Sequence, residues 1–359
     1  GVIYSSFFIA YTVLSPVIGL MGDRYNARLL ITVFVAILGA GAFLMAYASS
    51  IIQASFFFTL AGIGSAACWA PVMALTQRWT SDKHRGKTLA FVDVGSASGI
   101  ILTSATMPLI VSAYDWMAGW RSLGILGFVV TAICFFMIKS KPDEQSKFNT
   151  AGLQQQTREP ISVIYKRLLG DKIFWLIGLA YMFTGFSVMI PFTFLSTYAS
   201  QELSFSFAAA ARLITVVGVG GVVGKITLGP LSDKIGRIQV MMMCALLIAV
   251  GTAVMAYSHG ITLTIFTAIF GLGYGALWSM YAASASDYFS KGAAGSIVGL
   301  WTFYLGVGLV ISPIIAGWIG DTTGTLSGSF LMAAAGAVVS FLLLVPVWRK
   351  ITQGDSPVS

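Results

Sequence analysis

The sequence has little charge and few of the residues that hold metals or carry redox chemistry. Charged residues make up 9% of the 359-residue chain, which contains three cysteines and two histidines. Cys68, Cys134 and Cys244 are isolated within apolar segments, and His84 and His259 lie in the connections between such segments. No pair has metal-ligand or redox spacing, and no clustered nucleophile and base is visible. The pattern therefore argues against an enzyme and predicts no metal and no cofactor.

Long hydrophobic runs dominate the rest of the sequence. Apolar residues make up 57% of the chain, which no soluble domain resembles. They form runs of about 20 residues, the length that an α-helix needs to cross the hydrocarbon layer of a membrane. The eleven runs cover approximately residues 1–20, 29–48, 54–76, 88–111, 120–138, 173–198, 206–231, 238–257, 261–285, 294–318 and 328–348. The sequence thus predicts an all-α membrane protein.

A short charged turn occurs twice, 210 residues apart. One copy, starting at Gly19, reads GLMGDRYNAR, and the other, starting at Gly229, reads GPLSDKIGR. Each copy joins two membrane-length runs, which indicates a duplicated helical bundle of the kind found in secondary transporters. The second copy follows two runs after the central polar segment, whereas the first follows only one run. We therefore expect an N-terminally truncated chain that carries eleven of twelve helices.

One long polar segment divides the chain into halves. The expected domains are an N-terminal bundle at 1–138, a cytoplasmic linker at 139–172, a C-terminal bundle at 173–348 and a cytoplasmic tail at 349–359. The linker carries seven basic and four acidic residues. We expect it to be partly disordered, with an amphipathic surface helix near Ile161–Leu169.

Positive charge is concentrated on one side of the predicted membrane. Of the 21 lysines and arginines, 18 fall in alternate connections, in the linker or at the C-terminal end. The positive-inside rule makes these segments cytoplasmic in a multi-pass protein of the cell membrane. The net charge of +8 therefore reflects topology rather than nucleic-acid binding. The expected partners are membrane lipid and a small organic acid, and the expected state is a monomer.

The charged turns resemble the signature cytoplasmic loops of the major facilitator superfamily. Three other segments are similar to its monocarboxylate porter and oxalate/formate antiporter-like group: GIGSAACWAP at 62–71, GWR at 119–121, and SPIIAG at 312–317. The resemblance covers the whole chain. It implies the major facilitator fold, with two pseudo-symmetric six-helix bundles. It also implies a secondary active transporter of a small organic anion, a monocarboxylate, that works by alternating access with proton symport.

Lys225 is a charged residue near the middle of a predicted helix. It lies eight residues before Asp233, so it is roughly 12 Å along the helix from the cytoplasmic turn. A charge in the membrane costs about 2.5–3.5 kcal/mol on insertion scales, and the sequence supplies no acid one turn earlier, at Gly221. We therefore expect the substrate carboxylate to be its partner. The resemblance implies the same role, although these porters usually carry arginine here. The alternative is a lysine that snorkels to the cytoplasmic surface.

Asp93 is the second candidate inside the membrane. It lies one to two turns inside the cytoplasmic end of its predicted helix. One interpretation makes it the titrating group of a proton symporter, with the proton as coupling ion. The other makes it a partner of Lys87 or Arg85.

Aromatic residues form a possible binding face. Tyr274, Trp278 and Tyr281 follow at i, i+4 and i+7, and Tyr4 and Tyr11 are also seven residues apart. Their hydroxyl and indole groups are able to surround a small organic anion. The alternative is packing or lipid contact.

Seven charged residues at the cytoplasmic turns are predicted to control conformational change rather than to bind substrate. An aspartate in such a turn can accept backbone hydrogen bonds at a neighbouring helix N-terminus, while the cations pair with acids or lipid phosphates. The alternative is that these charges are merely solvated. The predicted gating set is Asp23, Arg24, Arg28, Asp233, Lys234, Arg237 and Asp287.

Three other functions remain open: an organic-anion exchanger, a drug exporter of the same superfamily, and a membrane sensor that kept the fold but lost transport. The run at 294–318 contains no lysine or arginine, whereas the resemblance implies a second cation there in oxalate and formate exchangers. Residues 95–99 lack the Gly-Pro and Gly-Gly pairing of the drug antiporters. Accumulation of labelled solute in vesicles would separate a transporter from a sensor.

Overall fold

The computed structural model describes residues 2–139, 161–289 and 293–352. Eleven spans in these ranges are long and apolar enough to cross a membrane, so the predicted all-α membrane fold is confirmed. The helices are α1 (Val2–Arg24), α2 (Ala27–Met45), α3 (Ile51–Ser65), η1 (Ala66–Cys68), α4 (Ala70–Arg78), η2 (Asp82–His84), α5 (Arg85–Ala113), α6 (Trp116–Met137), α8 (Ile161–Gly170), α9 (Lys172–Gln201), α10 (Phe207–Ile235), α11 (Arg237–Met255), α12 (Gly260–Tyr288), α13 (Ala294–Thr323) and α14 (Ser327–Thr352).

One predicted span is interrupted. Helices α3 and α4 together form the third span, but the short 3₁₀ helix η1 and Trp69 separate them. Pro71 lies in the first turn of α4, where its missing N–H and fixed φ are tolerated. Proline alone does not explain the interruption, since α1, α9, α10, α13 and α14 each continue through a proline. The interruption places Trp69 against the core of the C-terminal half.

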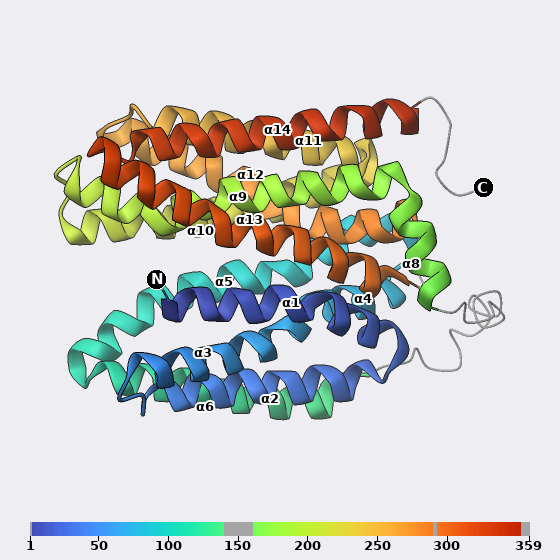
Figure 1. Ribbon diagram of the computed structural model, residues 1–359, viewed down its shortest axis with the longest axis horizontal. Coiled ribbons are helices and arrows are strands. Elements are labelled where there is room, and N and C mark those ends of the chain that lie inside the picture. The colour runs from blue at the N-terminus through green and yellow to red at the C-terminus, as the bar shows by residue number, and fades with distance from the viewer. Residues whose placement is uncertain (1, 140–160, 290–292, 353–359) are drawn as a thin grey trace.

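Helices α1–α6 and α9–α14 form two groups that lie side by side (Figure 1). The groups meet mainly through two helix pairs, α1 with α13 and α5 with α10, and smaller contacts join α12 to α4 and α5, and α13 to α4. In Figure 1 these pairs converge toward the end of the molecule where α8 lies, and they diverge toward the opposite end. We call these the α8 end and the distal end.

Glycine allows the backbones of the two halves to approach closely. A Cβ on Gly19 of α1 would overlap the carbonyl oxygen of Gly295 in α13. A Cβ on Gly229 of α10 would overlap the Cβ of Ala90 in α5. In a membrane, small residues let helices associate through close packing, because lipid is as apolar as the side chains. These contacts hold the halves together near the α8 end.

The predicted domain limits can be compared with the helices themselves. Helix α8 lies within the predicted linker and starts where the surface helix is expected, at Ile161. Helix α14 continues to Thr352, four residues beyond the predicted limit of the C-terminal bundle at 348. Residues 140–160, which include most of the linker predicted to be disordered, and 353–359 of the predicted tail lie outside the described residues.

Candidate functional site

A buried ion pair joins the two halves. Lys225 Nζ of α10 lies 2.9 Å from Asp93 Oδ2 of α5, and the two side chains are 0% and 1% exposed. The same Nζ donates hydrogen bonds to the Asp93 carbonyl oxygen at 2.7 Å and to Ser96 Oγ at 2.6 Å. Ser96 Oγ in turn donates to Asp93 Oδ1 at 2.8 Å. The three side chains thus form a closed polar ring.

The pair lies well inside the membrane-spanning helices. Asp93 follows the start of α5 at Arg85 by eight residues, and Lys225 precedes the end of α10 at Ile235 by ten residues. At 1.5 Å per residue these positions are about 12 and 15 Å from the helix ends. A charge at such a depth is stabilised only by a partner, and here each residue supplies the partner of the other.

This arrangement corrects three expectations. The expectation that Lys225 lacks a protein acid is wrong, because its partner is 132 residues away in the chain rather than one turn away. The snorkelling alternative is also wrong, since Nζ is held by Asp93 and Ser96. Asp93 pairs with Lys225 rather than with Lys87 or Arg85, which lie nearer the end of α5.

Aromatic side chains of the C-terminal half lie beside the pair. The ring of Trp278 lies 5.6 Å from both Tyr274 and Tyr181, measured between centroids. Tyr181, from α9, also stacks on Tyr281 at 4.0 Å. Tyr181 and Tyr274 lie close enough to Asp93 to interact with it electrostatically. The structure therefore places Tyr274 within electrostatic range of the ion pair and packs Trp278 on Tyr274, and their role in binding remains a prediction.

The other predicted aromatics differ in their surroundings. Tyr281 is 1% exposed, and its hydroxyl lies 3.2 Å from Thr184 Oγ1, which suits a packing role within the C-terminal half. Tyr11 of α1 is half-buried and interacts electrostatically with Tyr181. The side chain of Tyr4 lies outside the described part of the structure.

Tyr181 is the central residue that sequence reasoning missed. Its hydroxyl is buried beside Trp69, whose indole N–H can only donate to the hydroxyl oxygen, and the O–H finds no acceptor of normal geometry within the described ranges. An unsatisfied buried donor is costly, so the O–H is available to donate to a polar ligand. No feature of the sequence distinguishes Tyr181 from the other tyrosines in membrane helices. Ser96 was also missed, because it lies in a segment of small residues at 95–99 that gives no sign of a polar contact.

At the α8 end, Asp23 binds the N-terminus of α13. It accepts hydrogen bonds from the backbone N–H of Gly295 at 3.0 Å, and from the N–H and hydroxyl of Ser296 at 2.6 and 2.8 Å. Arg78 Nη2 lies 3.5 Å from the same carboxylate. This is the helix-terminal hydrogen bonding that the sequence predicts, and it joins the two halves.

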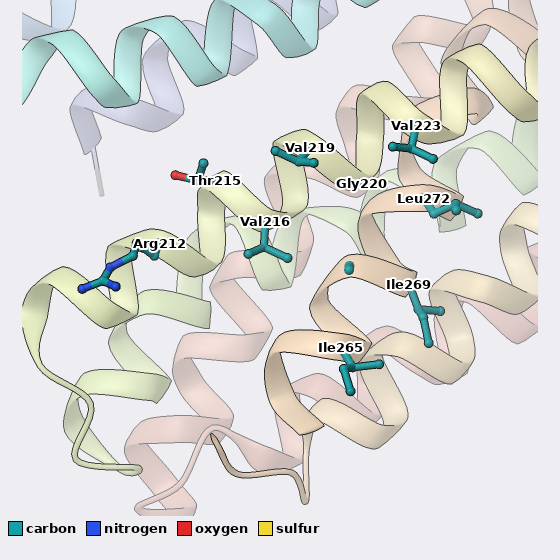
Figure 2. A pocket seen from close by; sticks show the side chains of 10 residues that line it. Arg212, Thr215, Val216, Val219, Gly220, Val223, Ile265, Ile269 and Leu272 are labelled. Carbon is teal, nitrogen blue, oxygen red and sulfur yellow. The ribbon is translucent and has the colours of Figure 1, made fainter. Parts of the chain in front are cut away.

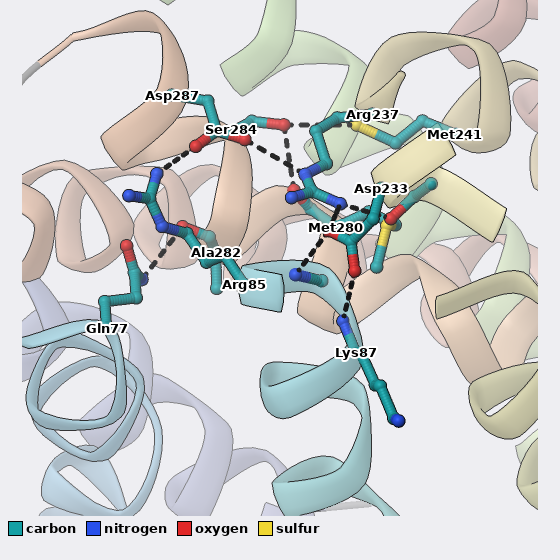
Figure 3. A network of polar contacts seen from close by, with 12 residues as sticks. Gln77, Arg85, Lys87, Asp233, Arg237, Met241, Met280, Ala282, Ser284 and Asp287 are labelled. Atoms are coloured by element: carbon teal, nitrogen blue, oxygen red, sulfur yellow. Dashed lines mark hydrogen bonds and ion pairs between the residues drawn. The ribbon is translucent and has the colours of Figure 1, made fainter. Parts of the chain in front are cut away.

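Asp233 repeats the arrangement with the halves exchanged. It accepts hydrogen bonds from the backbone N–H groups of Gly86 and Lys87, both at 2.9 Å, at the N-terminus of α5 (Figure 3). Each charged turn thus binds the first residues of a helix in the opposite half, where the helix dipole favours an anion.

Two arginines extend the second contact. Arg237 Nη1 lies 2.5 Å from Asp233, and Arg237 Nε lies 2.9 Å from Asp287 Oδ2. Asp287 also pairs with Arg85, which comes from the N-terminal half and is 1% exposed (Figure 3). Arg85 was therefore missed as a gating residue, because the sequence pointed to it only as an alternative partner of Asp93.

The remaining predicted gating cations lie elsewhere. Arg24 and Lys234 are exposed. The Arg28 guanidinium lies 4.6 Å from the ring centroid of Phe135, within the N-terminal half. A further contact between the halves was missed by the sequence: Gln77 Nε2 donates to the carbonyl oxygen of Ala282 at 3.0 Å.

Two bundles joined through reciprocal charged turns define a multi-pass membrane protein of the secondary transporter type. The family model of the Major Facilitator Superfamily matches residues 1–226 and 177–359, and the chain belongs to this superfamily.

Known proteins resemble the chain over most of its length. The hexuronate transporter of Bacillus subtilis (strain 168) is 25% identical over 386 aligned residues, which cover 100% of this chain and 89% of that protein. Monocarboxylate transporter 12 of Xenopus laevis is 25% identical, with 79% of this chain and 66% of that protein covered. The crystal structure of the human organic anion transporter MFSD10 (TETRAN) has a TM-score of 0.78 at 15% identity, covering 96% and 83% of the two chains.

Proposed function

We propose that the protein moves a small organic anion, a monocarboxylate, across the membrane by alternating access with proton symport. The observation that carries this proposal is the buried pair between Lys225 and Asp93, which lies between the two halves. Tyr181 and Tyr274 lie within electrostatic range of Asp93, and Trp278 packs on Tyr274. The protein works as a monomer in the cell membrane, with the linker in the cytoplasm. It needs neither an organic cofactor nor nucleic acid.

The pair suits a coupled reaction. When Asp93 carries a proton, its attraction for Lys225 is lost, and the buried ammonium group needs another anion. A substrate carboxylate supplies that charge, and the Tyr181 hydroxyl is available to hydrogen-bond it. One proton and one monocarboxylate together add no net charge to the site, so the membrane cost of moving the loaded protein is kept low.

The relatives support an anionic cargo. A hexuronate carries one carboxylate, and a monocarboxylate does so by definition, so the names of both relatives denote the same functional group. An organic-anion exchanger of the same superfamily is the second candidate, because Lys225 would serve an exchanger equally well.

Uptake by the protein in liposomes tests the proposal. Labelled lactate, pyruvate and glucuronate are offered with and without an inside-alkaline pH gradient. We expect accumulation of at least one acid above the outside concentration only with the gradient, and none with Lys225→Ala or protein-free liposomes. Accumulation that requires internal organic anion but no gradient would favour the exchanger. Binding without any accumulation would favour a sensor.

A further inference from the structure

The outer surface of the C-terminal half contains a groove that the transport proposal does not use. It lies between α10 and α12 and has a volume of about 620 Å³ (Figure 2). Its lining is almost entirely apolar and ends at a single cation. The lining residues are Arg212, Thr215, Val216, Val219, Gly220, Val223, Ile265, Ala268, Ile269 and Leu272.

The groove is formed by the way the two helices pack. A Cβ on Gly220 would lie 2.7 Å from the carbonyl oxygen of Ala268, so the absence of a side chain lets α10 and α12 come together at the floor. Val219 and Ile265 stand beside it and are 51% and 50% exposed. In a membrane an exposed apolar surface of this kind is covered by lipid.

The length and charge of the groove match one leaflet. Arg212 and Val223, at its two ends along α10, are eleven residues apart, which corresponds to about 16 Å. This is close to half of the ~30 Å hydrocarbon layer. Arg212 is exposed and lies thirteen residues from Lys225, about 20 Å toward the distal end. The cation therefore lies at the level of the lipid headgroups, and the apolar part extends toward the middle of the membrane.

We propose that this groove is a binding site for an anionic phospholipid of the distal leaflet. The acyl chain lies along Val219, Val223 and Ile265, and the headgroup phosphate contacts the Arg212 guanidinium, which suits phosphate geometry.

The same two helices carry Lys225 and Tyr274, so the lipid stabilises the packing of helices that form the candidate transport site.

Native mass spectrometry of the detergent-solubilised protein tests the site. The probes are phosphatidylglycerol and phosphatidylcholine with identical acyl chains. Both lipids carry a headgroup phosphate, but the choline cation of phosphatidylcholine offsets its charge beside Arg212. We therefore expect one phosphatidylglycerol to bind roughly fivefold more tightly than phosphatidylcholine. Arg212→Gln should remove this preference but keep weak binding of both lipids. Val219→Trp, which fills the groove, should abolish the bound copy of either lipid.

Matched controls separate the groove from general lipid contact. Val250→Trp changes a valine of α11 that is 49% exposed but does not line the groove, and Lys350→Gln removes an exposed cation at the α8 end. Both should leave the binding unchanged. Equal affinity for the two lipids in the wild-type protein, or undiminished binding by Val219→Trp, would overturn the proposal. Displacement of the lipid by inorganic phosphate alone would also overturn it, because the acyl chain would then contribute nothing.

Discussion

The Lys225–Asp93 pair stabilises the fold only while both charges are present. Removing one partner of a buried ion pair leaves an uncompensated charge and costs about 3–5 kcal/mol. We therefore expect Asp93→Asn and Lys225→Gln to lower the thermal stability of the detergent-solubilised protein. The double variant should recover most of the loss. If both single variants melt at the same temperature as the wild-type protein, the pair is not buried as described.

Lys225 should also be required for the binding of a substrate carboxylate. Lys225→Ala should abolish it, Lys225→Gln should retain at most weak binding through a neutral hydrogen bond, and Lys225→Arg should retain it because a guanidinium also binds carboxylate. Binding of labelled acids to membranes measures these affinities, with protein amount determined separately. Wild-type affinity in Lys225→Ala would show that the substrate does not use this cation.

If the proton couples through Asp93, the affinity for substrate should depend on pH through protonation of this carboxylate. Among the described residues, the titratable side chains that interact with this carboxylate are Lys225, Tyr181 and Tyr274. Protonation of Asp93 frees Lys225, so substrate binding to the wild-type protein should tighten as the pH falls. Asp93→Asn removes the competing charge at every pH, and its affinity should be nearly independent of pH. Equal pH profiles for the two proteins would place the proton site elsewhere.

The charged turns act at the scale of whole helices, because each aspartate holds the N-terminus of a helix from the other half. Hydrogen bonds to a charged group contribute about 1.5–3 kcal/mol, so Asp233→Asn should slow the conformational cycle by roughly 10- to 150-fold. Substrate Kd should stay nearly unchanged, since Asp233 lies roughly 12 Å along the helix from Lys225. Initial uptake rates and equilibrium binding together measure the two effects.

Lys87→Gln is the matched control for Asp233→Asn. The Lys87 side chain is exposed, and only its backbone N–H contacts Asp233. This variant keeps the N–H and should transport at the wild-type rate. Loss of binding with intact turnover in Asp233→Asn would reverse the assignment of this residue to gating.

The helices could be predicted from the sequence because membrane spans are read from local composition. The interruption at Ala66–Trp69 could not be predicted, since Pro71 is the only local signal and proline also lies inside uninterrupted helices such as α9. Lys225 and Asp93 could be selected separately because charge is rare in membrane helices. Their pairing could not be predicted, because it depends on how α10 packs against α5 across the two halves.

At the scale of the whole molecule, the repeated turns join the halves at one end only. The family model matches the chain in two overlapping ranges, as expected for a duplicated bundle. The aspartate of each half binds the N-terminus of a helix in the other half. In the proposed alternating-access mechanism these contacts break in the other state, and the halves rock about the central pair.

Loss of both aspartates should therefore shift the conformational equilibrium. In a background with the three cysteines replaced by alanine, spin labels at Tyr25→Cys and Arg349→Cys report the distance between the halves at the α8 end. Labels at Tyr114→Cys and Tyr257→Cys report the distal end, and all four positions are exposed. The change Asp23→Asn with Asp233→Asn should lengthen the first distance and shorten the second, because only the α8 end loses hydrogen bonds between the halves. Unchanged distance distributions at both ends would mean that packing of α1 on α13 and of α5 on α10 holds this state without the charged turns.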